Sequence, residues 1–260
     1  MHRKNAWGFC SRGEIKVEDN IIFGKNSVTE ALIAGREINK ILISKNAHSD
    51  AKLNKIKELA KANGVVFQFV AKEKFMQYAQ YNHQGVIAYI SPIKYVDLDE
   101  FLEQKHENDS LVILDGIEDS HNFGAIIRTC VCAGVSGIII PARRNVQVNA
   151  IVEKISAGAI NHIPIIKVNS PVSAVQKLKE SDWWVVAADA SASDNYYDIN
   201  YRDMNFALIM GAEHAGVSKS LLKLSDFIVK IPMLKDFNSL NVSNAFSAII
   251  FESVRQKLKN

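Results

Sequence analysis

The sequence predicts an α/β protein that is divided into two units. Short apolar runs alternate with segments of helical periodicity along most of the 260 residues, which is typical of sheets flanked by helices. A polar run from Glu103 to Asp109 interrupts this alternation. Hydrophobic residues make up 48% of the chain, enough for a core in each unit. We therefore expect a flexible N-terminal extension over residues 1–20, a small α/β unit over 21–92, a linker over 93–109 and a larger α/β domain over 110–260.

The small unit is expected to begin with a helix. Ser27 followed by Glu30 has the spacing of a capping box, which predicts that the helix begins at Ser27. Further on, apolar residues recur at helical spacing up to Gly64, a residue typical of helix ends. The expected elements are a helix up to about residue 34, a strand over 40–44, a helix over 51–63, a strand over 65–70, a helix over 72–80 and a strand over 85–90.

The larger domain shows a longer series of the same kind. Strands are expected over residues 111–114, 137–140, 163–168, 183–188, 206–210 and 227–231. Helices are expected over residues 123–133, 149–157, 171–180, 218–224 and 242–258. This alternation favours a largely parallel sheet with helices on both faces. Ligands of such sheets bind beyond the carboxyl ends of the strands, so chemistry is expected in the loops that follow the strands.

Charge alone does not identify a partner. The formal net charge is +3, too small to indicate nucleic-acid binding by itself. Basic residues are instead clustered near the N-terminus, at Arg143–Arg144 and in the helix expected over 51–63. That helix carries Lys52, Lys55, Lys57 and Lys61. These lysines fit either an RNA-binding surface or an ordinary solvated face.

Several classes of protein are disfavoured. The three cysteines lack the spacing of a disulfide framework, and the seven histidines lack metal-ligand spacing, so we expect no metal. We expect Cys130 and Cys132 to be packing residues. No apolar run reaches the roughly 18 residues of a membrane helix, and no secretory signal is recognisable, which predicts a cytoplasmic protein with no membrane segment. Glycine-rich motifs of nicotinamide-binding and P-loop proteins are absent from the sequence.

Three polar segments follow expected strands, and the first spans residues 114–128. It places Asn122 at the mouth of a helix and Arg128 among apolar residues of that helix, which we expect to be buried on most sides. A guanidinium in such a place requires an anion or a functional site. A structural salt bridge of Arg128 with Asp115 or Glu118 is the alternative, and Asn122 alone is also compatible with a helix cap.

The other two segments span residues 208–217 and 231–245. In the first of them, small residues let the backbone approach a ligand, although an ordinary exposed glutamate is the alternative; it contains Gly211, Glu213 and Gly216. The last segment enters the final helix through polar residues that suit a polar ligand group or an N-cap, namely Ser239, Asn241, Ser243 and Asn244. Its apolar residues can wall a slot for an adenine ring, and they are Ile231, Pro232, Met233 and Leu240.

In this order the three segments resemble the SpoU (TrmH) family of RNA ribose 2′-O-methyltransferases. The resemblance covers about residues 110–256 and rests on Asn122, Gly124 and Arg128, on Met210-Gly-Ala-Glu213 with Gly216, and on Ile231-Pro-Met233 followed by Ser239-Leu-Asn-Val-Ser243. Residues 21–92 are similar to the ribosomal-protein-like domain of bacterial members that methylate a guanosine of 23S rRNA. Lys235 departs from the glycine that the family often has there.

The resemblance implies a fold, a partner and a reaction. The catalytic domain would be a SPOUT-type α/β domain threaded into a deep trefoil knot, and the protein would be a homodimer. It would move a methyl group from S-adenosylmethionine to a ribose 2′-hydroxyl of rRNA. The cofactor would contact Gly211, Ile231 and Leu240, with Met233 and Asn241 nearby. The catalytic set would be Arg128, Glu213, Asn122, Ser239 and Asn241.

The expected role of Arg128 is that of an anchor. A guanidinium keeps its proton at neutral pH, so it is better suited to hold an RNA phosphate and the developing alkoxide than to act as a base. Glu213 would orient Arg128 or take the proton through water. Two alternatives remain, a tRNA ribose methyltransferase of the same family and a non-catalytic RNA-binding protein of ribosome assembly.

Overall fold

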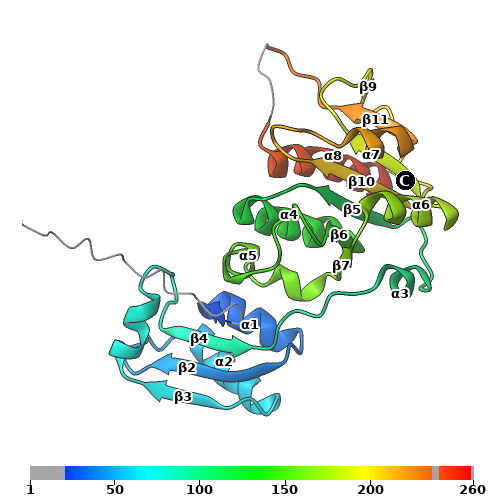
Figure 1. Ribbon diagram of the computed structural model, residues 1–260. Coiled ribbons are helices and arrows are strands. Elements are labelled where there is room, and N and C mark those ends of the chain that lie inside the picture. Colours follow the sequence, from blue (N-terminus) through cyan, green and yellow to red (C-terminus); the bar gives the residue numbers. More distant parts are fainter. Residues whose placement is uncertain (1–20, 236–239, 259–260) are drawn as a thin grey trace, which may run out of the picture.

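The computed structural model describes residues 21–235 and 240–258. The chain forms two sheets flanked by helices, one built from the first part of the chain and one from the remainder (Figure 1). The expected α/β class, with a parallel sheet in the larger domain, is confirmed. None of the helices in the described ranges is long and apolar enough to cross a lipid bilayer.

The first unit has a four-stranded sheet in the order β1-β4-β2-β3. One face packs on α1 and α2 through an apolar cluster that includes Ile41 and Ile56, and the other carries a second cluster around Leu42 and Phe75. The elements are β1 (Ile21–Phe23), α1 (Lys25–Ile33), β2 (Ile38–Ser44), α2 (Ala51–Ala62), β3 (Phe67–Val70), the 3₁₀ helix η1 (Lys72–Tyr78) and β4 (Val86–Ile90).

The start of this unit differs from our expectation. Strand β1 was not expected, and α1 begins at Lys25 rather than at Ser27, which is buried inside the helix. The predicted capping box is wrong because the cap comes from a distant loop: the Lys25 backbone N–H donates to Oε1 of Gln84 (3.2 Å). Glu30 instead lies 3.2 Å from Nε2 of His162 in the second domain.

The second domain has a seven-stranded parallel sheet in the order β7-β6-β5-β10-β8-β11-β9. Its elements are α3 (Leu98–Leu102), β5 (Ser110–Asp115), α4 (Ser120–Ala133), β6 (Gly137–Pro141), α5 (Ala150–Ser156), η2 (Ala159–His162), β7 (Ile165–Val168), α6 (Pro171–Glu180), β8 (Trp184–Ala188), β9 (Asp194–Asn195), β10 (Phe206–Gly211), α7 (Lys219–Leu224), β11 (Phe227–Lys230) and α8 (Val242–Leu258). Of these, α3 lies in the segment expected to be a linker, yet Leu98 and Phe101 are buried in the core of this domain.

A buried ion pair joins the two units. Arg36, just after α1, places Nη1 2.6 Å from Oε1 of Glu153 on α5, and its Nη1 also donates to Oδ1 of Asn161 (3.2 Å). Glu153 is only 4% exposed; burial raises the pKa of this carboxyl, and the neighbouring Arg36 opposes the shift. Ala150 at the start of α5 packs in the same apolar cluster as Phe23 of β1. Helix α5 and the following η2 therefore both contact the first unit.

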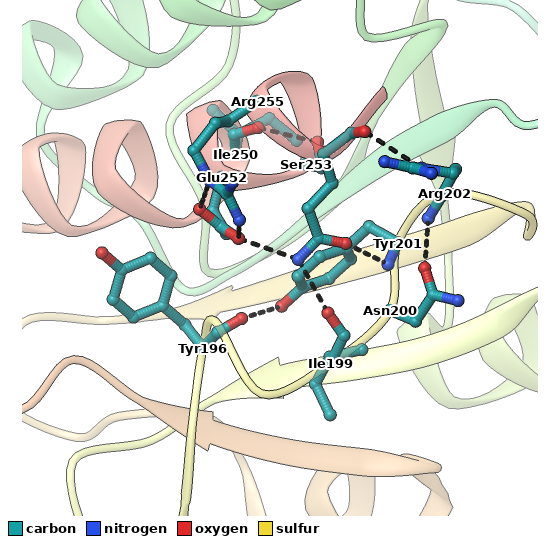
Figure 2. Close-up of polar contacts among 10 residues, drawn as sticks. Tyr196, Ile199, Asn200, Tyr201, Arg202, Ile250, Glu252, Ser253 and Arg255 are labelled. Atoms are coloured by element: carbon teal, nitrogen blue, oxygen red, sulfur yellow. Dashed lines mark hydrogen bonds and ion pairs between the residues drawn. The ribbon is translucent and has the colours of Figure 1, made fainter. Parts of the chain in front are cut away.

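A second polar network holds the carboxyl-terminal half of α8 against the loop that follows β9 (Figure 2). Gln256 accepts a hydrogen bond from the Tyr201 backbone N–H (2.8 Å) and donates from Nε2 to Ile199 O (2.9 Å) and Glu252 Oε1 (2.8 Å). Arg255 Nε donates to Glu252 Oε2 (2.7 Å). Burial raises the pKa of the Tyr201 hydroxyl, which donates to Tyr196 O (2.9 Å). The network fixes α8, whose amino-terminal end lies in the candidate site.

Candidate active site

The site lies at the carboxyl edge of the large sheet. Strands β5 and β10 pair in register up to their last residues, where Asp115 lies opposite Gly211. Their following loops therefore start side by side, and the segment after β11 leads into α8, which packs on α4. Parallel strands bring all three predicted segments to this edge.

One polar side chain from each segment meets the other two. Asn122 of α4 donates from Nδ2 to Oε1 of Glu213 (2.9 Å). Asn241 donates from Nδ2 to the same Glu213 oxygen (2.9 Å) and to Oδ1 of Asn122 (2.9 Å). These three residues form a closed set of hydrogen bonds, which we call the polar triangle. Asn122 is 8% exposed, whereas Glu213 and Asn241 are open to solvent.

Local capping explains why both amides are available. Asp119, not Asn122, is the N-cap of α4, and its Oδ1 accepts from the His121 backbone N–H (2.6 Å). Asn122 is thus free of the capping role that we considered for it. Asn241 precedes α8 and accepts from the backbone N–H (3.0 Å) and hydroxyl (2.6 Å) of Ser243 through Oδ1. Its other side-chain atom, Nδ2, remains directed at Asn122 and Glu213.

The turn that carries Glu213 depends on Gly211. A Cβ atom at Gly211 would lie 2.1 Å from the backbone carbon of Gly216 and 2.2 Å from the backbone nitrogen of Val217. The Gly216 N–H donates to Ala212 O (2.8 Å), which closes the turn on itself. Gly211 therefore permits close approach of the loop to itself. The result is a rigid support for Glu213. Gly211 and Gly216 also line the cavity described next, and the expected close approach to a ligand stays a prediction.

A cavity of about 950 Å³ lies beside the polar triangle. Its lining includes Gly211, Glu213, Lys235 and the apolar residues Met210, Ile231, Pro232, Met233, Leu240 and Val242. Its size and mixed lining suit a drug-sized organic ligand. The carboxylate of Asp189 also lines it, a residue that our sequence reasoning missed. Its position directly after the strand expected over 183–188 was the available signal.

Arg128 does not lie where we expected. It is exposed on α4 and makes no hydrogen bond or ion pair within the described part of the chain. Neither salt bridge considered for it forms; Asp115 instead accepts from the Ser218 backbone N–H (2.8 Å). Apolar composition does not show which face of α4 is buried: that face packs on α5, α8 and the sheet, whereas Arg128 lies on the open face. Cys130 is buried as expected, but the prediction that Cys132 is a packing residue is wrong, because Cys132 is exposed on the same open face. Ser239 lies outside the described residues.

Two exposed arginines also lie at this edge of the sheet. Arg143 and Arg144 are exposed on the loop after β6, which is tied to the loop after β5 by the Val146 N–H donating to Ile117 O (2.7 Å). Within residues 21–235 and 240–258, no group of three or more histidine, cysteine or carboxylate side chains is arranged to hold a metal ion.

Comparison with known proteins places both units of the chain in known families. Residues 109–251 match the SpoU rRNA methylase family, and residues 21–96 match the substrate-binding domain of RNA 2′-O ribose methyltransferases. A Staphylococcus aureus protein assigned to the TrmH family of tRNA/rRNA methyltransferases is 40% identical over 93% of this chain and 98% of its own length. A Staphylococcus saprophyticus relative with the same assignment is 38% identical over 93% of this chain and 97% of its own length.

Solved structures share the fold. An AdoMet-bound rRNA methyltransferase of Sinorhizobium meliloti has a TM-score of 0.78 and 25% identity, over 92% of this chain and 88% of that one. A TrmH/SpoU tRNA-modifying enzyme of A. aeolicus has a TM-score of 0.53 and 32% identity, over 62% of this chain and 82% of that one.

Fold, site and sequence together define an RNA methyltransferase. The chain belongs to the SpoU rRNA methylase family, as the match over residues 109–251 and the 40% identity to the S. aureus relative show. The resemblance inferred from the three polar segments is thereby confirmed at the level of the family.

Proposed function

We propose that this protein transfers a methyl group from S-adenosylmethionine to the ribose 2′-hydroxyl of a guanosine in 23S rRNA. The observation that carries the proposal is the polar triangle of Asn122, Glu213 and Asn241, placed beside a cavity that is large enough for the cofactor. The S. meliloti rRNA methyltransferase matches both units of the chain, whereas the tRNA-modifying enzyme matches only 62% of it, which favours rRNA.

The residues of the cavity fit the cofactor. Ile231, Met233 and Leu240 offer an apolar wall to an adenine ring, and the Asp189 carboxylate can accept hydrogen bonds from ribose hydroxyls or pair with an ammonium group. When bound, the cofactor supplies a methyl group that is activated by its sulfonium. The remaining tasks, holding the RNA and removing the hydroxyl proton, fall to side chains of this chain.

Glu213 and Arg128 share those tasks in the proposal. The two amides hold Oε1 of Glu213 at the mouth of the cavity, where the carboxylate can take the proton directly or through water. Arg128 is exposed and without a protein partner in the described residues, so its guanidinium is available to an RNA phosphate. Its exposure supports the anchoring role over a buried salt bridge.

The experiment that tests the proposal replaces Arg128. Arg128→Ala should abolish methylation of a 23S rRNA transcript and leave the affinity for S-adenosylmethionine nearly unchanged, because Arg128 does not line the cavity. Loss of cofactor binding would contradict this assignment. Arg128→Lys keeps the charge but not the bidentate geometry, so turnover near that of the unmodified protein would argue against a bidentate contact.

A homodimer and a cytoplasmic location belong to the same proposal. Phe251 on α8 is 45% exposed, an aromatic side chain suited to a contact between two copies. Phe251→Lys should then shift the sedimentation coefficient from that of a dimer to that of a monomer.

Mapping 2′-O-methylation in rRNA and tRNA, with and without the protein, distinguishes the proposed rRNA substrate from the tRNA alternative. A pure binding protein would give no calorimetric heat with S-adenosylmethionine.

A further inference from the structure

We propose that a second cavity, in the first unit, binds one unpaired nucleotide of the RNA substrate. This cavity lies between the end of β2 and the loop that precedes β4 and has a volume of about 600 Å³. We call it the N-unit cavity. Its lining residues are Lys25, Ser44, Asn46, Ala47, His48, Asp50, Lys52, Lys72, Phe75, His83, Gln84 and Gly85. The inference rests on the proposed RNA methylation and names the place where the first unit holds that RNA.

The charge of the N-unit cavity fits a phosphate at its rim. Its lining has three lysines and one aspartate. Lys25 is buried and pairs with that aspartate, since its Nζ lies 2.7 Å from Oδ2 of Asp50. The other two, Lys52 and Lys72, are exposed; Lys52 donates only to the neutral Asn26 (2.9 Å), and Lys72 makes no ion pair within the described chain. Two lysines therefore remain for phosphate oxygens.

The wall of the cavity is built rather than a loose gap between loops. The Lys25 Nζ donates to His48 O (2.9 Å) and its backbone N–H to Gln84, so that one residue joins both sides of the cavity. Gln84 has a φ of 49°, a left-handed conformation that non-glycine residues seldom adopt. Gly85 follows at φ 76°, where a Cβ would lie 2.8 Å from Cβ of Ala47.

The interior offers groups that suit a nucleobase. His83 accepts from the Gly85 backbone N–H through Nδ1 (2.9 Å), so its neutral ring carries the proton on Nε2 as a donor. Burial lowers the pKa of His83, which favours this neutral form. The ring also lies against Phe75, with centroids 4.9 Å apart. Phe75 is buried behind this ring (2% exposed), so the aromatic face offered to a base is that of the half-buried His83. Histidine rings can stack on splayed-out bases of single-stranded RNA, whereas bases inside a duplex are out of reach.

The N-unit cavity is linked to the polar triangle through α5. Tyr81, two residues before His83, has Nζ of Lys154 on α5 5.6 Å from its ring centroid. At the other end of α5, Asn149 donates to the hydroxyl of Ser120 (3.1 Å), which opens the helix that carries Asn122. Helix α5 has 7 residues, hence a length of about 10 Å. The carboxyl ends of β2 and β10 also point to the same side of the molecule in Figure 1, so one RNA can reach both sites.

The test compares two pairs of lysines that carry the same charge. Lys52→Ala/Lys72→Ala removes both rim cations, and Lys55→Ala/Lys61→Ala removes two exposed cations of α2 that do not line the cavity. The first variant should weaken binding of a 23S rRNA transcript by about tenfold or more and lower the slope of log K against log salt by about 1 to 2. The second should stay within about threefold of the unmodified protein. Equal losses in the two variants would overturn the inference.

A competition experiment tests the unpaired nucleotide. Single-stranded homodecamers of A, C, G and U, and an A10·U10 duplex, are titrated against the bound transcript. At least one decamer should displace the transcript better than the duplex does, and the advantage should vanish in Lys52→Ala/Lys72→Ala; if the duplex competes as well as every decamer, the inference is wrong.

Failure of the inference and failure of the proposed function give different results. Absence of cofactor binding and of RNA methylation by the unmodified protein would refute the proposed function. Normal methylation by the unmodified protein, with no difference between the two lysine pairs, would refute only the N-unit cavity as a nucleotide site.

Discussion

Glu213 accepts hydrogen bonds from two amides through one oxygen, an arrangement that fixes its carboxylate without neutralising it. Asn122 approaches from α4 and Asn241 from the residue before α8, and the two also bond to each other, so each holds the other in place. The two amides occupy one carboxylate oxygen of Glu213 and leave the other free to accept. The polar triangle thus presents an acceptor oxygen at a defined place beside the cavity.

At the residue scale, Glu213→Gln separates charge from hydrogen bonding. The glutamine oxygen can still accept from both amides, whereas the negative charge is lost. If Glu213 takes the proton or orients Arg128, methylation turnover should fall about 10²- to 10⁴-fold while calorimetry shows unchanged cofactor affinity. Ser243→Ala, which removes a hydroxyl bonded to Asn241, is the control. Turnover of Glu213→Gln equal to that control would show that the charge is not used.

At the scale of elements, backbone turns and helix ends place the site. The loop after β10 closes only because Gly211 lacks a side chain, and the far end of α8, the helix that Asn241 precedes, is held by Gln256. The ends of β10 and β11 would not by themselves fix the segments that follow them.

Gly211→Ala should eliminate cofactor binding. Its Cβ would lie 2.1 Å from backbone atoms, which cannot move away as a flexible side chain would. The matched control is Gly64→Ala, at a left-handed position (φ 67°) with no atom within 4 Å of the added carbon, where we expect a loss of only about 1–2 kcal/mol in unfolding free energy. Isothermal calorimetry with S-adenosylmethionine measures the first effect. Tight binding by Gly211→Ala would show that the turn can reopen without consequence.

Gln256→Leu should lower the free energy of unfolding by about 1–3 kcal/mol, because the Tyr201 N–H and the Ile199 carbonyl lose their partner. Arg255→Ala is the comparison on the same turn; it removes the ion pair of the half-exposed Arg255 with the buried Glu252, which keeps its hydrogen bond from Gln256, and should cost at most about 1 kcal/mol. Urea denaturation followed by circular dichroism measures both. A larger effect for Arg255→Ala would mean that the ion pair, and not the amide, fastens α8.

At the scale of the whole molecule, the buried pair of Arg36 and Glu153 sets the first unit against the catalytic domain. Burying two charges is costly unless both are paired, and here each has its partner within 2.6 Å. Asn161 adds a further hydrogen bond to Arg36 (3.2 Å). Because the same helix, α5, reaches toward α4, the contact fixes how RNA held by the first unit would approach the polar triangle.

Arg36→Met should destabilise the protein by about 3–5 kcal/mol at neutral pH, since Glu153 is left charged and unpaired. Burial already raises the pKa of Glu153 above its usual value of 4.5, and loss of Arg36 raises it further. A carboxyl with a raised folded-state pKa binds its proton more readily in the folded protein. The stability of Arg36→Met should therefore increase as the pH falls from above that raised pKa toward 4.5.

Thermal unfolding between pH 5 and pH 8 measures this dependence. The control is Arg36→Met combined with Glu153→Gln, in which the titrating group is gone. A pH profile of the single variant that is parallel to that of the control would contradict the assignment to Glu153.

The sequence located the loops of the site but not every side chain in them. Asn122, Glu213 and Asn241 follow three strands whose parallel arrangement is readable from alternation, so their meeting could be expected. The exposure of Arg128 could not be expected from the sequence, because the composition of α4 shows that the helix is apolar but not which of its faces is covered. The start of α1 was missed for a similar reason, since its cap, Gln84, is 59 positions away from Lys25 along the chain.

By itself the sequence determined the α/β class, the family and the three polar segments that the structure brings to one edge of the sheet, because strand alternation and short motifs are local properties of the chain. The tertiary structure decided which polar atoms meet, how closely the loop after β10 packs against Gly211, and that Asp189 lines the cavity. It also decided that a buried ion pair fixes the two units. All of these features depend on contacts between residues that are far apart in the sequence. The same local pattern is compatible with many such contacts, and only the packing of the folded chain decides which of them form. The trefoil knot stays a prediction from the resemblance, as do the roles of the site residues.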